Sequence, residues 1–253
     1  SKALPLFTVL TISATGSEMN WGSVLSNDEE QIKCPLHSPH FFPKVSIIDP
    51  SVQMSLPWHQ TVNGGIDAMV HTLEYYFVGE NSETTIAIDE AIIKTIIKSV
   101  DDLQKDPNNY GSRSDLAWAA TVALNGVSGA GMNGGEWATH MIEHAISALH
   151  TEVAHGAGLA VIMPAWIKYT YKLAPEQFNR WAKNIWKCDD VESAIEKMKA
   201  KFMSWGSPVK LRELGIEEAE IPAIADNVLL LGAPGQIKRL EREDLINILK
   251  IAF

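Results

Sequence analysis

Along most of the chain, apolar residues recur at three-, four- and seven-residue steps, the spacing of helices that bury one face. The clearest case opens at Ser82 and ends at Asp106, with Ile86, Ile93, Ile97 and Val100 on its apolar face. Further helices are predicted over 114–127, 175–185, 190–206 and 242–252, and Asp190 is expected to cap the helix that follows it. The pattern therefore predicts a mainly α protein.

The first fifty residues follow a different pattern. Short β-branched and aromatic runs at Phe7–Ile12 and Lys44–Ile48 predict strands, and the polar stretch 26–31 predicts an exposed loop. Two strands are too few for a sheet that is stable alone. We expect a β-containing region, residues 1–53, in front of a helical domain, residues 54–253.

Composition narrows the functional classes. The 253 residues are 46% hydrophobic and 21% charged, which is typical of a folded globular protein. Acidic residues outnumber basic ones by 31 to 21, so the net charge of −10 argues against nucleic acid as a partner. No apolar run suits membrane insertion or a signal peptide, and two distant cysteines, Cys34 and Cys188, favour a reducing compartment. We expect a cytoplasmic protein with no membrane partner.

Histidines provide the candidate chemistry, because four of the eight fall between His140 and His155. His140 and His144 are four residues apart and would share one helix face, as would Asp67 and His71. Asn63 is expected to cap the helix that carries Asp67 and His71, which would place Asp67 in its first turn. One carboxylate with three imidazoles would suit iron or zinc, although either pair alone also fits an ordinary polar pair.

Two other enzyme classes and a non-enzymatic role also fit parts of this pattern. His140-Met141-Ile142-Glu143-His144 matches the H-x-x-E-H signature of metallopeptidases, in which Glu143 would be the general base, but Asp67 and His71 would then have no role. A helical metal-dependent phosphohydrolase would need basic residues near the metal, and the histidine cluster has none nearby in sequence. A structural or dimerising module would bind no metal.

Two glycine-containing segments need separate interpretation. The stretch 129–134 spells G-x-G-x-x-G, but it follows a helical pattern and not a strand, so it is interpreted as a turn between helices. The segment 11–20 leaves a strand and offers hydroxyls, a glycine and backbone N–H groups. Such a loop can bind phosphate oxygens, although an ordinary polar turn has the same composition.

Four motifs in this order resemble the iron-dependent, group III alcohol dehydrogenases, nearest to their NADPH-dependent butanol dehydrogenase and aldehyde reductase branch. The resemblance runs from residue 8 to about residue 170, and more loosely beyond. The motifs are Thr11-x-x-Ala14-Thr15-Gly16-Ser17-Glu18, Asn63-Gly64-Gly65-Ile66-Asp67-Ala68-x-x-His71-Thr72-x-Glu74, Trp137-Ala138-Thr139-His140-Met141-Ile142-Glu143-His144, and His155-Gly156-Ala157-Gly158-Leu159-Ala160.

The resemblance implies an enzyme that transfers hydride reversibly between a primary alcohol or aldehyde and NAD(P), as a homodimer. It implies a divalent iron or zinc ion that polarises the substrate oxygen, with His144 beside the substrate and nicotinamide. The implied metal ligands are Asp67, His71, His140 and His155, and the implied cofactor-binding residues are Thr11, Thr15, Asn20 and Lys33.

The sequence departs from the family pattern in two places. The segment from His144 to His155 is one residue longer than usual, which brings His150 into consideration, and the glycines after His155 decide for His155. Family members also carry a nucleotide-binding α/β half with a G-G-G-S turn in front of the threonine loop, and nothing here corresponds to it. We therefore expect residues 1–53 to be the end of that half, in a fragment that holds metal but lacks most of the NAD(P) site.

Overall fold

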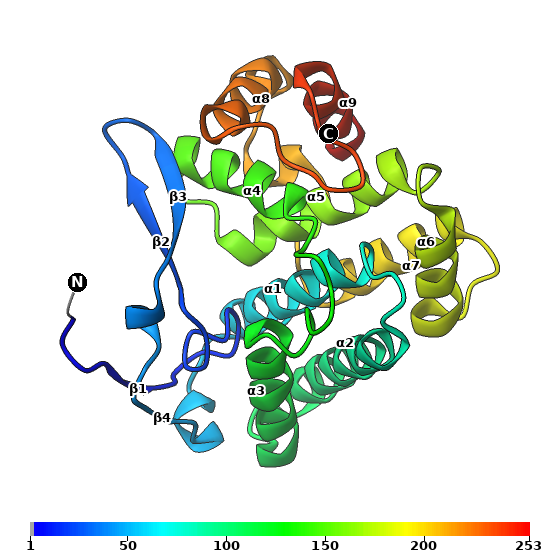
Figure 1. Cartoon of the computed structure of the whole chain (residues 1–253). Coiled ribbons are helices and arrows are strands. Elements are labelled where there is room, and N and C mark those ends of the chain that lie inside the picture. The colour runs from blue at the N-terminus through cyan, green and yellow to red at the C-terminus, as the bar shows by residue number, and fades with distance from the viewer. Residues whose placement is uncertain (1–2) are drawn as a thin grey trace.

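The structure is a computed structural model that describes residues 3–253, and it is predominantly helical with two small sheets (Figure 1). The strands are β1 (Phe7–Val9), β2 (Gly22–Asn27), β3 (Ile32–His37) and β4 (Val45–Ile47). The helices are α1 (Trp58–Tyr76), α2 (Glu83–Lys105), α3 (Tyr110–Leu124), α4 (Ala138–Leu149), α5 (His155–Thr170), α6 (Pro175–Trp181), α7 (Val191–Ser204), α8 (Ile221–Val228) and α9 (Arg242–Ala252).

The helices predicted from periodicity are present, and the mainly α prediction is confirmed. α9 has the predicted bounds, and the Asp190 carboxylate accepts a hydrogen bond from the Ser193 backbone N–H at the start of α7. α3 begins four residues earlier than expected, because Asn109 caps it by accepting from the N–H of Ser112. The glycine-rich stretch 129–134 lies in the connection between α3 and α4, as predicted, and not in a βαβ unit.

The N-terminal region contains one parallel and one antiparallel strand pair. β1 and β4 pair in parallel, with Phe7 opposite Val45, and both lie in the two segments predicted as strands. The prediction of a loop over 26–31 was partly wrong, because Ser26 and Asn27 belong to a β2–β3 hairpin whose turn covers 28–31. The hairpin side chains are exposed or half-buried, so no alternating apolar pattern marked them.

α1 begins earlier than predicted, and Asn63 does not cap it. The helix starts at Trp58, directly after Pro57, so Asn63 and Asp67 both lie well inside it. The amphipathic signal is weak here because almost every residue from Thr61 to Tyr76 is buried. Asp67 and His71 therefore project from a rigid helix interior and not from a fraying end.

α1 is the central helix of the domain, with α2 and α3 on one side and α4 and α5 on the other (Figure 1). Two glycines of the domain allow close backbone approaches to neighbouring elements. A Cβ on Gly64 would lie 2.2 Å from the Ser13 carbonyl oxygen, and one on Gly156 would lie 2.2 Å from the carbonyl oxygen of Asn63. These contacts fix the β1–β2 loop and the start of α5 against α1.

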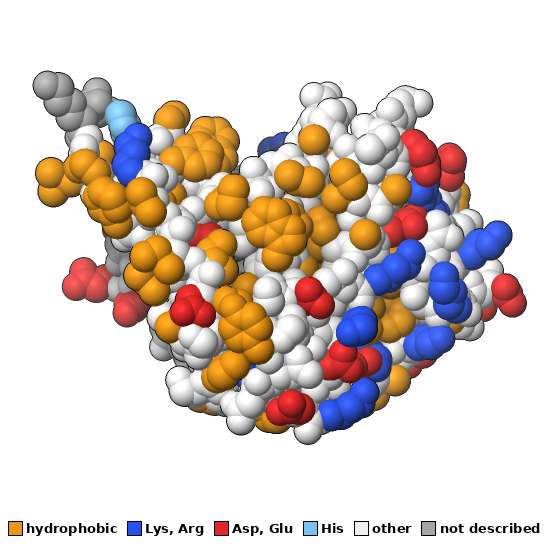
Figure 2. Space-filling view, turned by 90° about the horizontal axis from the view of Figure 1, so that it is seen from below, with side chains coloured by type: hydrophobic (Ala, Val, Ile, Leu, Met, Phe, Trp, Pro, Cys, Tyr) orange, Lys and Arg blue, Asp and Glu red, His pale blue; other side chains and the backbone are white. Residues whose placement is uncertain are grey.

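The surface is divided between apolar and charged regions. Figure 2 shows apolar side chains gathered on the side of one face that carries the N-terminal strands, and charged side chains on the other side. Phe7, Val9, Val45 and Ile47 of the parallel strand pair are each more than half exposed. In the described part of the chain, no helix combines the length and apolar character needed to cross a bilayer.

Candidate metal centre

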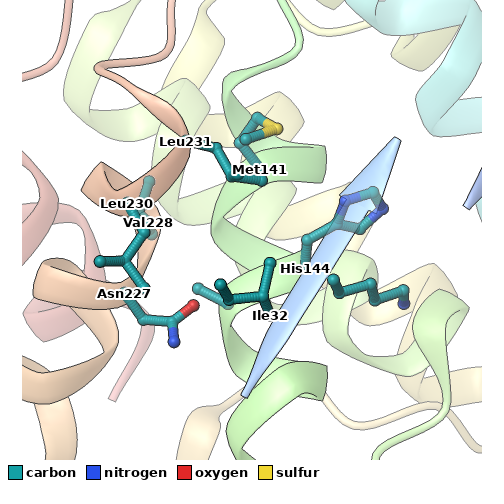
Figure 3. A pocket seen from close by; sticks show the side chains of 9 residues that line it. Ile32, Met141, His144, Asn227, Val228, Leu230 and Leu231 are labelled. Carbon is teal, nitrogen blue, oxygen red and sulfur yellow. The ribbon is translucent and has the colours of Figure 1, made fainter. Parts of the chain in front are cut away.

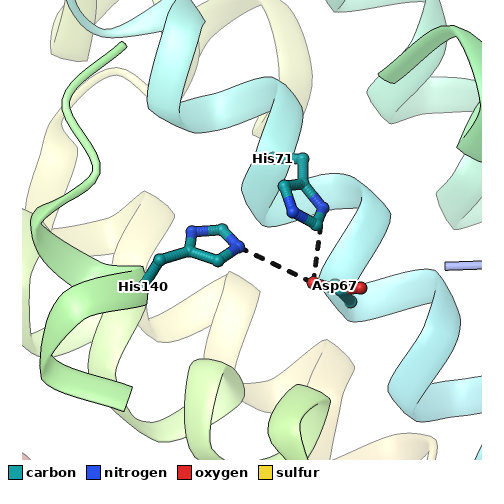
Figure 4. A group of neighbouring side chains, drawn as sticks. All are labelled: Asp67, His71 and His140. Carbon is teal, nitrogen blue, oxygen red and sulfur yellow. Dashed lines mark ion pairs between the residues drawn. The ribbon is translucent and has the colours of Figure 1, made fainter. Parts of the chain in front are cut away.

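Three helices bring one carboxylate and three imidazoles together in the interior. Asp67 and His71 lie on α1, His140 on α4, and His155 is the first residue of α5. Asp67 Oδ1 lies 3.3 Å from His71 Nδ1, 3.7 Å from His140 Nε2 and 3.5 Å from His155 Nε2. Figure 4 shows His71 and His140 approaching the same carboxylate oxygen from their two helices.

The donor atoms have the spacing and the lack of partners expected of ligands. Four donors about 2.1 Å from a tetrahedral zinc-like ion lie about 3.4 Å from one another, which is close to the three distances measured to Asp67 Oδ1. Asp67 Oδ1, His71 Nδ1 and His140 Nε2 are buried and have no hydrogen-bond partner. Because buried polar atoms are normally satisfied, this cluster fits a divalent cation.

Glu74 orients His140 from the side opposite Asp67. Its Oε1 lies 3.1 Å from His140 Nδ1, accepts from the His140 backbone N–H at 3.2 Å, and accepts from the Thr139 hydroxyl. A proton on Nδ1 leaves the lone pair of Nε2 facing Asp67, the arrangement by which carboxylates orient metal-binding histidines. Glu74 lies three residues after His71 on α1, so Asp67, His71 and Glu74 share one helix face. That spacing in the sequence was a signal that could have identified Glu74.

Glu143 does the same for His155. Its Oε2 contacts His155 Nδ1, which leaves Nε2 toward Asp67, and Lys33 Nζ lies 3.4 Å from the same oxygen. Lys33 also donates to Ser147 Oγ at 2.8 Å, so its ammonium joins the β-hairpin to α4. Donor atoms of Asp67, His71 and His140 lie within 4.8 Å of one another, and those of Glu143, His144 and His155 form a second group of this kind. His155 links the two groups, because its Nδ1 contacts Glu143 and its Nε2 lies 3.5 Å from Asp67 Oδ1.

Burial and charge act in opposite directions on the pKa values of the cluster. Burial raises the pKa of Asp67, but His71, His140 and His155 outweigh it and hold that pKa well below its usual range. Burial lowers the pKa of His71 to about 3. Burial also lowers the pKa of His140, yet the carboxylates of Asp67 and Glu74 on either side of its ring dominate and raise it to about 9. The Asp67 carboxylate is therefore ionised at neutral pH, as a ligand must be, whereas His140 would release its Nε2 proton when an ion binds there.

His144 lies one turn beyond His140 on α4, and its ring centroid is 5.4 Å from that of His155. Burial lowers the pKa of His144 to about 3, so the imidazole is neutral, and its Nδ1 has no hydrogen-bond partner. Beside it is a cavity of about 10 Å³, lined also by Ile32, Met141 and Leu231 (Figure 3). This volume has room for no more than about one water molecule.

The loop between β1 and β2 is held against the helices. The Asn20 amide donates to the Thr15 carbonyl at 2.7 Å and its Oδ1 accepts from the Gly22 N–H, so Asn20 shapes the loop itself. Thr11 and Thr15 are exposed. The resemblance implied four cofactor-binding residues. The side chains of Thr11 and Thr15 take no part in the hydrogen bonds that shape the loop, whereas Lys33 points into the histidine cluster.

His150 lies outside the cluster. Its Nε2 is 3.1 Å from Glu220 Oε1 and its Nδ1 is 3.6 Å from Glu152 Oε1, at the C-terminal end of α4. The histidine that faces Asp67 across the domain is His155.

Comparisons with known proteins identify the family of both parts of the chain. Residues 61–253 match the C-terminal part of the Fe-containing alcohol dehydrogenase family, and residues 1–50 match the iron-containing alcohol dehydrogenases. The chain is 38% identical over 263 residues to the probable NADH-dependent butanol dehydrogenase 1 of Bacillus subtilis strain 168, which covers 99% of this chain and 67% of the relative. It is 35% identical over 229 residues to the NADPH-dependent aldehyde reductase YqhD of Escherichia coli K12, covering 88% and 59%.

The fold agrees with solved structures. The structure of NADH-dependent butanol dehydrogenase A from Thermotoga maritima superposes with a TM-score of 0.96 at 48% identity, covering 99% of this chain and 66% of that one. The chain thus spans about two thirds of the length of these relatives. On the match over 61–253 and these identities, the chain belongs to the Fe-containing alcohol dehydrogenase family.

Proposed function

We propose that this chain forms the metal-binding part of an enzyme that interconverts primary alcohols and aldehydes, with hydride transfer to or from NAD(P). The supporting observation is the convergence of three imidazole nitrogens on one buried oxygen of Asp67, at 3.3 to 3.7 Å. We assign divalent iron or zinc to Asp67, His71, His140 and His155. When bound, the ion supplies a Lewis acid that polarises the substrate oxygen.

The protein's own groups prepare this site in two ways. Glu74 and Glu143 hold His140 and His155 in the tautomers whose Nε2 atoms face Asp67. His144 is our candidate for relaying the hydroxyl proton, because its Nδ1 is buried without a partner beside this cluster.

The proposed cofactor site includes the loop between β1 and β2. The exposed hydroxyls of Thr11 and Thr15 are available to the phosphates or ribose of NAD(P), while Asn20 keeps the loop in shape. Lys33 would meet the nicotinamide end of the cofactor near His155. The relatives are named for NADH and for NADPH, and the proposal is accordingly NAD(P).

The peptidase and phosphohydrolase alternatives are not supported. Glu143 is fully buried, its Oε2 is already paired with His155 and Lys33, and its unpaired Oε1 is enclosed by the protein, so it does not present a carboxylate oxygen to a solvent water molecule. The division at residue 53, the homodimer and the cytoplasmic location stay predictions.

Metal analysis of the purified chain tests the proposal. We expect about one iron or zinc ion per chain, and we expect His140→Ala to lose it. His59→Ala is the matched control, because His59 is an exposed histidine on α1, and this variant should keep the full complement. A full metal content in His140→Ala, or none in the unaltered chain, would contradict the ligand assignment. In a protein of the relatives' full length, the same substitution should abolish alcohol-dependent NAD(P) reduction.

A further inference from the structure

Trp137 is held in an unusual backbone conformation directly in front of α4. Its φ of 58° and ψ of 4° are left-handed, a region that bulky residues rarely adopt. Such a conformation is unfavourable for a residue with a bulky side chain and persists only where the surrounding structure imposes it. The position of the indole is therefore a feature that the rest of the fold maintains.

The residues on either side of Trp137 are fixed by hydrogen bonds. Before it, the Glu136 N–H donates to the Glu74 carbonyl at 2.8 Å. The buried Glu136 carboxylate accepts from the backbone N–H groups of Gln236 and Ile237, each at 2.7 Å. After it, the His140 N–H donates to the Glu74 carboxylate. The chain is thus anchored on both sides of the left-handed residue.

The half-buried indole lies against the metal-binding histidines. Its ring meets those of His71 and His140 edge-on, with centroids 6.2 Å and 5.4 Å away, and Tyr75 backs it at 5.3 Å and 85°. Gly135 makes room for it, because a Cβ there would lie 2.8 Å from the indole Nε1. One side of the donor cluster is therefore aromatic.

The groups that contact His155 are polar, and the apolar Ile32, Met141 and Leu231 lie beyond His144, around a cavity of about 10 Å³ that is too small for a carbon chain. Lys33, Glu143 and Ser147 are joined there by hydrogen bonds, and His144 packs against His155. A primary alcohol has the same asymmetry, since its hydroxyl is polar and its carbon chain is apolar. With the hydroxyl oxygen at the donor cluster and its proton toward His144, the carbon chain is left to the aromatic side.

We propose that Trp137 is a specificity-determining residue whose indole forms the apolar wall for the carbon chain of a primary alcohol or aldehyde. This inference rests on the proposed function. Each methylene buried against such a wall should tighten binding by about threefold to fourfold, the factor for burying one CH₂ group. The unaltered protein should therefore prefer longer unbranched alcohols, and removal of the indole should weaken that preference.

Cobalt(II) provides a readout that needs no turnover. The chain is loaded with Co(II), and its visible absorption is titrated with ethanol, 1-propanol, 1-butanol and 1-pentanol for the unaltered chain, Trp137→Phe and Trp137→Ala. Trp118→Ala is the matched control, because Trp118 lies on α3 and is 57% exposed. All variants are first compared for thermal unfolding and for Co(II) stoichiometry.

We expect Trp137→Ala to bind one Co(II) with unchanged affinity and to lose most of the gain per methylene, with Trp137→Phe intermediate and Trp118→Ala unchanged. An unaltered gain per methylene in Trp137→Ala would overturn the proposal, as would loss of Co(II) from both variants, since Trp137 would then only support the ligands. Failure of the unaltered chain to take up Co(II) would refute the proposed function itself, and with it this inference.

Discussion

Asp89 should make the stability of this protein fall as the pH rises. The residue lies on α2 with a fully buried side chain, and neither carboxyl oxygen has a hydrogen-bond partner. The nearby Ser128 hydroxyl donates to the Val122 carbonyl at 3.1 Å and is therefore already engaged. Burial raises the pKa of Asp89 to about 8, and the neighbouring Glu90 charge adds to the shift.

The sign and size of the effect follow from proton linkage. Between pH 3.8 and about 8, the folded chain keeps the Asp89 proton while the unfolded chain has released it. The folded state therefore binds more protons, and the free energy of unfolding decreases by about 1.4 kcal/mol per pH unit in this window. At pH 7 the loss relative to pH 4 is about 4 kcal/mol from this group alone.

Asp89→Asn removes the titration and keeps a neutral side chain of the same shape. The free energy of unfolding in urea is measured for the unaltered chain and for this variant at pH 5, 6, 7 and 8. We expect the variant to become steadily more stable than the unaltered chain as the pH rises. Asp115→Asn is the control, because Asp115 is exposed on α3, and this variant should keep the unaltered pH profile. Parallel pH profiles for the unaltered chain and Asp89→Asn would refute the reasoning.

Two further predictions concern the metal centre. Gly156→Ala should destabilise the fold by about 2 kcal/mol or more in urea unfolding, because its Cβ would lie 2.2 Å from the Asn63 carbonyl oxygen. Gly111→Ala, where the nearest atom would be 3.4 Å away, should change stability by less than about 1 kcal/mol. Glu74→Gln should weaken metal binding by about 10- to 100-fold in chelator competition, since it no longer fixes the His140 tautomer; unchanged affinity would show that Glu74 does not orient the ligand.

Periodicity predicted the helices that have one exposed face and failed for those that have none. α9 and α2 alternate buried and exposed residues, and their ends were predicted to within a residue. α5 is buried almost throughout and contains Pro164, so it offers neither a polar face nor an uninterrupted pattern. The β2–β3 hairpin was missed for the opposite reason, because its side chains lie mostly at the surface.

For the site, sequence reasoning reached the pairs that lie on one helix. The four-residue step from Asp67 to His71 survives the wrong start predicted for α1, because helical spacing does not depend on where the helix begins. The contacts of His140 and His155 with Asp67 depend on how α4 and α5 pack on α1, which no local pattern encodes. The glycines after His155 and the family resemblance together singled out that histidine. The Asp67 oxygen that the three histidines face became visible only with the fold.

The position of the donor cluster depends more on backbone contacts between its helices than on contacts among the donor side chains. α1 is buried on all sides, and Gly156 brings the α5 backbone against it within a distance that any larger residue would prevent. Since His155 immediately precedes that glycine, the helix contact itself places its imidazole at the Asp67 carboxylate. The buried carboxylates of Glu74 and Glu143 then fix ring orientation. In a site assembled in this way, the packing of α5 on α1 sets the spacing between the donors of Asp67 and His155, and the two glutamates set the direction in which the imidazoles of His140 and His155 point.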